Sequence, residues 1–305
     1  MAPGWCDHAA RVLAFARTRT SDHMDLPTET TSSGAADDAM IVPATSKRPG
    51  VWSGLGVVAL YFLLQFGLSM LIGVIIGFVL VMKASVEAGM HHRHLDAKGV
   101  VALAMRTNPD IQGVLTVVTI AAAAVVMALI VRQFWRAQWS RDELPGFGFV
   151  QPAHKSNYLG AVLLGIGVLL LGGAITHLLA GQHPVHQDVA VMASQVSLGL
   201  RLLLALLVVG VAPFVEEMVF RGVLLSGLAS RMPVGWAIVV SAVVFGCVHL
   251  PDFKFSWYPV PALVLLGLAL GWIRVRSGSL WPSITLHATN NFFAMLAWFL
   301  VSKPH

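Results

Sequence analysis

Charged residues are scarce in this sequence. Only 11% of its 305 residues are Asp, Glu, Lys or Arg, whereas an ordinary soluble domain has about 25%. Hydrophobic residues make up 56% of the chain. A soluble fold cannot hide that much apolar surface, so the composition excludes an ordinary soluble protein.

Cysteine is almost absent as well. Cys6 lies in a polar segment and Cys247 in an apolar run, which provides neither a disulfide framework nor the ligand spacing of a zinc module. The net charge of +5 comes mostly from basic residues between the apolar runs, as is typical of segments beside anionic lipid headgroups. We therefore expect the lipid bilayer, and not nucleic acid, as a partner of this chain.

Long apolar runs recur from residue 51 onward. Crossing the hydrocarbon core of a bilayer takes about 20 apolar residues, and each run is long enough. The sequence therefore predicts an all-α fold, a polytopic transmembrane helix bundle of about seven to eight spanning helices. The uncharged runs are 51–82, 113–131, 156–182, 232–251, 255–273 and 277–302, and a seventh run, 202–231, contains charged residues.

Two segments differ from these runs. Residues 1–49 are polar and rich in Thr, Ser and Asp, which predicts a disordered N-terminal tail ahead of a transmembrane domain at 50–305. Residues 83–112 form a long polar connection whose apolar patch could be an interfacial helix or an eighth membrane segment. Basic residues gather at 132–155 and are missing from 183–200, so the positive-inside rule predicts a cytoplasmic N-terminus.

The seventh run contains three ionisable residues within six positions, Glu216, Glu217 and Arg221. An isolated charge at the centre of a spanning helix costs about 2.5–3.5 kcal/mol, so such residues usually pair or take part in chemistry. Glu216 lies 15 residues from both Arg201 and Arg231, near the middle of the helix. Glu217 and Arg221 are spaced i, i+4, which predicts an ion pair that leaves Glu216 to face elsewhere.

A histidine in the next run lies at the depth of Glu216. If the chain turns back near residue 232, Glu216 is 16 residues before the turn and His249 is 16 residues after Pro233. With a rise of about 1.5 Å per residue, both side chains reach the same depth. Phe245 precedes His249 by one helical turn, so its ring should wall one side of the imidazole.

The last run adds a second histidine and an amide. His287 and Asn291 are spaced i, i+4 and project from one face, whereas Asn290 points about 100° away. Other signatures of membrane proteases are missing, since no HExxH occurs and no GxGD or GxSG occurs in a spanning run. The polar residues that remain candidates for catalysis are therefore those of three helices.

Three motifs stand in order in these helices: EExxxR at 216–221, FxxxH at 245–249 and HxxxN at 287–291. In this order they resemble the CAAX prenyl protease and bacteriocin-processing (CPBP) family of intramembrane peptidases, also called the Abi family. The resemblance covers about residues 200–295, which would be the catalytic core. It implies a membrane-embedded endopeptidase of the CAAX-processing type.

The resemblance also implies roles for single residues. Glu216 and His249 would activate a water molecule, while His287 and Asn291 would stabilise the oxyanion of the tetrahedral intermediate. Glu217, Arg221 and Phe245 would surround and orient these catalytic residues. Whether the enzyme is a zinc metalloprotease or a metal-free glutamate protease stays open, and the residues that could hold zinc are Glu216, His249 and His287.

The expected partner is a peptide or membrane-protein substrate, and the expected location is a bacterial inner membrane. Two alternatives stay open. One is a non-catalytic bacteriocin-immunity or scaffold protein that keeps the helices without turnover. The other is a small-solute transporter with a proton-relay glutamate, although the sequence shows no inverted repeat of the kind typical of transporters.

Overall fold

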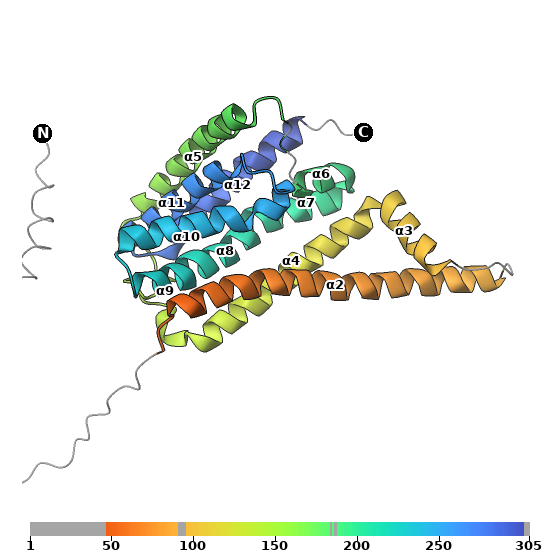
Figure 1. Ribbon diagram of the computed structural model, residues 1–305, viewed down its shortest axis with the longest axis horizontal. Coiled ribbons are helices and arrows are strands. Elements are labelled where there is room, and N and C mark those ends of the chain that lie inside the picture. The colour runs from red at the N-terminus through yellow and green to blue at the C-terminus, as the bar shows by residue number, and fades with distance from the viewer. Residues whose placement is uncertain (1–46, 91–95, 184, 186–187, 302–305) are drawn as a thin grey trace, which may run out of the picture. The chain divides into compact units, whose positions relative to one another are not determined.

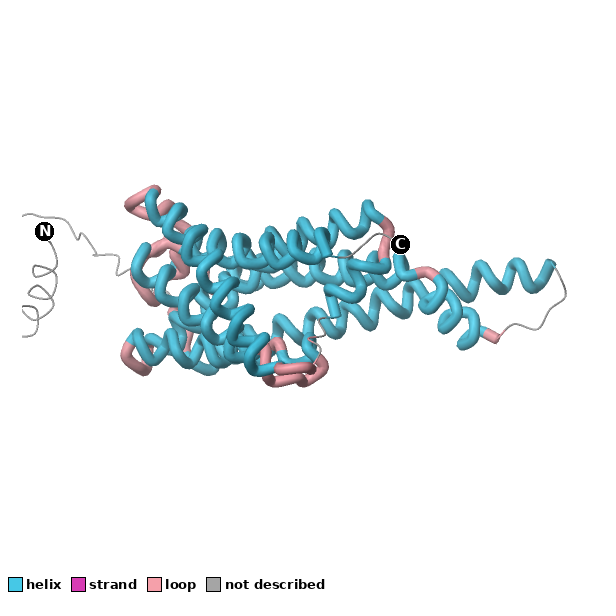
Figure 2. The backbone as a smooth tube through the Cα atoms, turned by 90° about the horizontal axis from the view of Figure 1, so that it is seen from above, coloured by secondary structure: helices cyan, strands magenta, loops and turns pink. Residues whose placement is uncertain are grey.

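The computed structural model describes residues 47–90, 96–183, 185 and 188–301. The chain divides into two units, Met1–Pro43 and Ala44–His305, and all of the described residues belong to the second unit. The tail expected at 1–49 therefore lies almost entirely outside the described residues. Helices are the only regular secondary structure in the part described (Figure 1, Figure 2), which confirms the all-α fold class.

Short connections join most of the helices. The apolar patch of the long connection forms a helix of its own, α3, and the first long helix runs eight residues beyond the expected end at residue 82. In chain order the helices are α2 Val51–Met90, α3 Ala97–Thr107, α4 Pro109–Phe134, α5 Ser156–Ala180, α6 Asp188–Gln195, α7 Leu198–Leu206, α8 Ala212–Glu217, α9 Leu225–Ala229, α10 Val234–Val248, α11 Val260–Ser277 and α12 Leu280–Val301.

Length and apolar composition identify the helices that can cross a membrane. Among the described residues, five helical stretches meet both conditions, and α10 is a shorter apolar helix. Helix α12, which packs against α5 and α11, is not one of the five. The predicted count of seven to eight spans is therefore approximate. The five stretches are Val51–Gly89, Pro109–Phe134, Ser156–Ala180, Leu198–Ala229 and Val260–Ser277.

The charged helix lies inside the bundle. Figure 1 shows α8 and α9 between α2 and α10, and α11 packs against both α10 and α5. Residues 217–228 are all buried. A helix that is covered on every side by apolar neighbours can hold ionisable side chains away from lipid, provided that they find partners within the protein.

Pro213 shapes the stretch Leu198–Ala229. The N–H of Ala212 bonds to the carbonyl of Leu207, five residues back, so the helix is wider here than an α-helix. In the same register the carbonyl of Val208 would need a hydrogen bond from the N–H of Pro213. Proline has no N–H, so the helix backbone leaves this carbonyl without that bond. A second wide turn follows at Met218–Leu224. The two wide turns flank Glu216 and Glu217, and such turns are frequent at functional sites.

Two glycines let neighbouring helices approach closely. A Cβ atom on Gly54 of α2 would lie 3.1 Å from the Cα of Leu224. One on Gly267 of α11 would lie 2.8 Å from the Cα of Ala242 in α10. Without a side chain at either position, α2 comes close to the charged helix and α11 comes close to α10. Both contacts help to enclose the site described next.

Candidate active site

Glu216 faces a cavity of about 330 Å³ that α2, α4, α8, α10, α11 and α12 line together. Its Oε2 atom lies 3.9 Å from Nε2 of His249 and 3.8 Å from Nε2 of His287. These separations are too long for direct hydrogen bonds, but one water molecule can bridge each of them. The structure thus brings an acid and two imidazoles from three separate helical segments to one cavity.

The other ring nitrogen of each histidine is occupied. Nδ1 of His249 lies 2.7 Å from the carbonyl oxygen of Phe245, and Nδ1 of His287 lies 3.0 Å from Oε1 of Glu217. A carbonyl oxygen and a carboxylate accept hydrogen bonds, so both Nδ1 atoms donate. In the neutral rings the Nε2 lone pairs then point toward Glu216. The phenyl ring of Phe245 lies against both imidazoles, with ring centroids 4.7 Å from His249 and 5.7 Å from His287.

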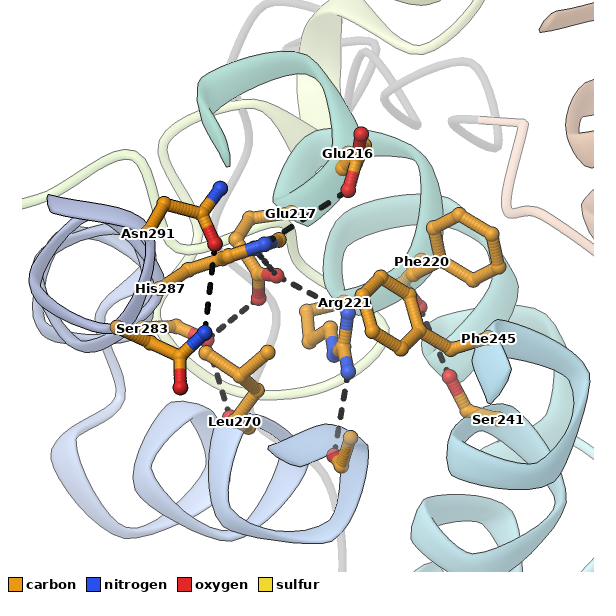
Figure 3. A network of polar contacts seen from close by, with 12 residues as sticks. Glu216, Glu217, Phe220, Arg221, Ser241, Phe245, Leu270, Ser283, His287 and Asn291 are labelled. Carbon is orange, nitrogen blue, oxygen red and sulfur yellow. Dashed lines mark hydrogen bonds and ion pairs between the residues drawn. The ribbon is translucent and has the colours of Figure 1, made fainter. Parts of the chain in front are cut away.

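Glu217 is the centre of a buried hydrogen-bond network (Figure 3). Its Oε1 accepts from Nη1 of Arg221 at 3.0 Å and from His287, and its Oε2 accepts from the Ser283 hydroxyl at 2.6 Å. The side chains of Glu217 and Arg221 are fully buried. The ion pair expected from their i, i+4 spacing is present, and it fixes the tautomer and orientation of His287.

Arg221 connects this network to the neighbouring helices. Its Nη2 donates to the carbonyl of Gly267 in α11 at 3.2 Å, and its guanidinium carbon lies 4.5 Å from the centroid of the Phe245 ring. The carboxylate, the carbonyl and the aromatic face all favour the cation. Arg221 therefore holds α10 and α11 against the charged helix at the level of the site.

Asn291 has a structural partner that sequence spacing does not reveal. Its Nδ2 donates to the carbonyl of Val208 at 2.9 Å, the carbonyl that Pro213 cannot satisfy. The same amide group retains a second hydrogen. Asn290, although about 100° away on the helix, also lines the cavity and lies 3.4 Å from Oδ1 of Asn291.

The donor atoms around Glu216 match zinc in type but not in spacing. Two imidazole nitrogens and a carboxylate are a common catalytic zinc set, and each imidazole has the required hydrogen bond at its other nitrogen. Ligand atoms in a zinc tetrahedron lie about 3.3 Å apart, closer than the 3.8 and 3.9 Å found here. Among the described residues no group of three His, Cys, Asp or Glu side chains is already arranged to hold a metal ion.

Several cavity residues are absent from the sequence-based set. Tyr61 and Gln65 reach the cavity from α2, and Asp252 from the turn after α10. Ser283 does not line the cavity, but its hydroxyl donates a hydrogen bond to Glu217. The sequence signal for Tyr61 and Gln65 was their i, i+4 spacing, which places two large polar side chains on one face of a mainly apolar run.

The chain was compared with known protein families, curated proteins and solved structures. Residues 198–293, from the start of α7 into α12, match the family described as type II CAAX prenyl endopeptidase Rce1-like. No curated protein and no solved structure matched the chain. The apolar helices and this match make the chain an integral membrane protein. The match confirms, over residues 198–293, the resemblance to the CAAX-processing membrane peptidases of the CPBP family that the three motifs predicted.

Proposed function

We propose that this protein is a membrane-embedded endopeptidase in which Glu216 activates a water molecule that cleaves a peptide bond of a peptide or membrane-protein substrate. The observation that carries the proposal is the placement of Glu216 within one bridging water of both His249 and His287, in a cavity inside the bundle. The family match supports a peptidase of this class. The helices that line this cavity limit the contact of the reacting groups with lipid.

The first step is addition of water to the scissile carbonyl. Glu216 takes one proton from the water. The other O–H of the water donates a hydrogen bond to the lone pair of His249 Nε2, which orients the water. The resulting hydroxide adds to the carbonyl carbon, which places the negative charge on the carbonyl oxygen. When the tetrahedral intermediate collapses, Glu216 returns its proton to the leaving nitrogen and the carbon–nitrogen bond breaks. The products are a carboxylic acid and an amine, and transfer of the remaining acid proton to the amine gives a carboxylate and an ammonium group.

The negative oxygen needs hydrogen-bond donors. In the imidazolium form, Nε2 of His287 donates to this oxygen while its Nδ1 donates to the Glu217 carboxylate. Asn291 can offer the hydrogen that Val208 does not use. Both groups already have a hydrogen-bond partner within the protein before substrate arrives, as effective stabilisation of a developing charge requires.

A zinc ion is compatible with the donor types of this site. Glu216, His249 and His287 are the residues that would hold it. Bound zinc would act as a Lewis acid on the water or the substrate carbonyl. The networks of Glu217 and Phe245 orient the two imidazoles in the same way with or without a metal.

The direct test is cleavage of a quenched fluorescent peptide that ends in a farnesylated CAAX sequence, together with its unmodified counterpart. We expect the purified protein to cleave at least one of them. Glu216→Gln and His249→Asn should each lower kcat/KM by about 10²- to 10⁴-fold. The exposed residues Glu143 and His154 provide matched controls, so Glu143→Gln and His154→Asn should keep full activity. No cleavage by the wild type, or full activity of Glu216→Gln, would overturn the proposal.

Metal analysis of the same purified protein distinguishes the two mechanisms. A zinc enzyme contains about one zinc ion per chain and loses activity on chelation, with recovery when zinc returns. A glutamate protease keeps its activity after chelation. In both cases the Glu216→Gln and His249→Asn variants remain inactive, so this measurement tests the cofactor and not the assignment of the residues.

We also propose that the chain lies in a bacterial inner membrane with its N-terminus in the cytoplasm. Basic residues at the end of α4 and in the connection that follows it support this orientation, namely Arg132, Arg136 and Arg141. Reporter fusions to the 136–155 connection and to the 183–197 connection test it. The first should report a cytoplasmic position and the second a position outside, and the reverse pattern would contradict the orientation.

A further inference from the structure

Two polar side chains of α2 have no role in the mechanism described above. Tyr61 and Gln65 are one helical turn apart, and both line the cavity that contains Glu216. They lie outside the matched segment, residues 198–293. Neither side chain has a hydrogen-bond partner among the described residues, and both are therefore available to a ligand in the cavity.

Helix geometry places Tyr61 beside Glu216 independently of the cavity. Gly54 of α2 lies against Leu224 of the charged helix. Tyr61 follows Gly54 by seven residues, and Glu216 precedes Leu224 by eight. Seven residues of an α-helix and eight residues that include the wide turn at Met218–Leu224 each make about two helical turns, along helices that run in opposite directions. Tyr61 is therefore on the same face of α2 as Gly54.

The environment of Tyr61 fixes its position. The residue is only 3% exposed and belongs to the core with Val57 and Val58. Its ring lies edge-on to that of Phe62, with centroids 5.4 Å apart. The carboxylates of Glu216 and Asp252 are close enough to interact electrostatically with its hydroxyl. A rigid phenol therefore presents its O–H group at the edge of the reaction centre.

The spacing of the two side chains suits an extended peptide. Positions i and i+4 of a helix are separated by about 6 Å along the axis. Peptide groups on one edge of an extended chain repeat every two residues, or about 6.7 Å. Inside a membrane there is no bulk water to satisfy the N–H and C=O groups of a substrate, so the protein must supply partners.

We propose that Tyr61 and Gln65 bind the main chain of an extended substrate segment in this cavity. The Tyr61 hydroxyl donates to a peptide carbonyl, and the Gln65 amide, which is both a donor and an acceptor, pairs with the peptide group two residues along. Helix α2 is thus part of the substrate site, although it lies outside the family match. This inference rests on the proposed function, since it assigns the binding residues of the same cavity.

The test uses two variants of the full chain and the peptide of the cleavage assay. Tyr61→Phe removes only the hydroxyl and keeps the ring, and Gln65→Leu removes the amide. Each should lower kcat/KM about tenfold, mainly through KM, because each deletes one hydrogen bond to the substrate. Each should also weaken binding of the intact peptide to the Glu216→Gln protein by about 3- to 10-fold. Tyr158→Phe is the matched control, because its hydroxyl bonds to Gln151 in an exposed position.

The outcomes separate this inference from the proposed function. Cleavage that depends on Glu216 but has wild-type kcat/KM and wild-type peptide affinity in both α2 variants would contradict the inference alone. Undiminished cleavage by Glu216→Gln would contradict the proposed function. If Tyr61→Phe fails to fold, Gln65→Leu carries the test, since Gln65 is only partly buried. Absence of both binding and cleavage in the wild type would contradict both.

Discussion

Replacing Arg221 with methionine should destabilise the protein strongly, because the substitution leaves the Glu217 carboxylate buried without its counter-charge. Arg221 and Glu217 are both fully buried and 3.0 Å apart. Methionine has a similar length and can fill the space, so the effect of the substitution is largely electrostatic. The remaining partners of Glu217 are the Ser283 hydroxyl and the His287 ring.

The magnitude follows from the contacts that are lost. Breaking a buried ion pair by removing one partner costs about 3–5 kcal/mol. For chains of 150–250 residues, a loss of 1 kcal/mol lowers Tm by about 2–4 °C. We therefore expect Arg221→Met to lower Tm by about 6–20 °C. The hydrogen bond from Arg221 to the Gly267 carbonyl is lost as well, which adds to the effect.

The assay is heating of the detergent-solubilised protein followed by size-exclusion chromatography. The double variant Glu217→Gln, Arg221→Met should have a higher Tm than Arg221→Met alone, since it no longer buries an unpaired charge. Arg136→Met is the control, because the Arg136 side chain is exposed. A Tm within about one degree of wild type for Arg221→Met, or additive effects in the double variant, would refute the reasoning.

Three other substitutions test the surroundings of the site. Asn291→Ala should lower the free energy of unfolding by about 1–3 kcal/mol, because it leaves the Val208 carbonyl unpaired. Adding Pro213→Ala supplies an N–H to that carbonyl, so the double variant should regain its Tm but not its peptidase activity. Gly267→Val should abolish activity by separating α11 from α10, whereas Gly173→Val, which meets nothing within 4 Å, should leave it unchanged. Ser283→Ala should reduce kcat about tenfold while KM stays constant, since the serine supports His287 only through Glu217.

The positions of several site residues along their helices could be predicted because helical spacing fixes depth and face. The i, i+4 spacing of Glu217 and Arg221 predicted their ion pair, and the structure contains it. Counting residues from the turn near Pro233 placed Glu216 and His249 at one depth, and their side chains approach to 3.9 Å. Depth is predictable since the rise per residue is nearly constant and the turn between the helices is short.

Lateral neighbours could not be predicted in the same way. Which helix lies beside the charged one depends on packing, and the contact of Gly54 with Leu224 cannot be recognised before the two helices are known to cross. Tyr61 and Gln65 were missed for that reason. Ser283 was missed because a serine in a membrane helix commonly bonds to its own backbone, whereas this one bonds to Glu217.

The partner of Asn291 depends on a local irregularity of the helix. Pro213 predicts a disturbed helix, but the register of the wide turn that frees the Val208 carbonyl is a property of the folded bundle. The motif alone implies only that Asn291 contacts the oxyanion. In the structure the amide also holds α12 against the charged helix, so the same residue supports the fold beside its proposed catalytic role.

The most direct test of the central claim is a double-mutant cycle of kcat/KM between Glu216 and His249. If both side chains act on one water molecule, Glu216→Gln with His249→Asn should cleave the peptide no more slowly, within about threefold, than the weaker of the two single variants. The protein should be present at wild-type levels in the membrane in all three cases. Losses that multiply, so that the double variant falls by the product of the two single effects, would show that the residues act independently and would contradict the account.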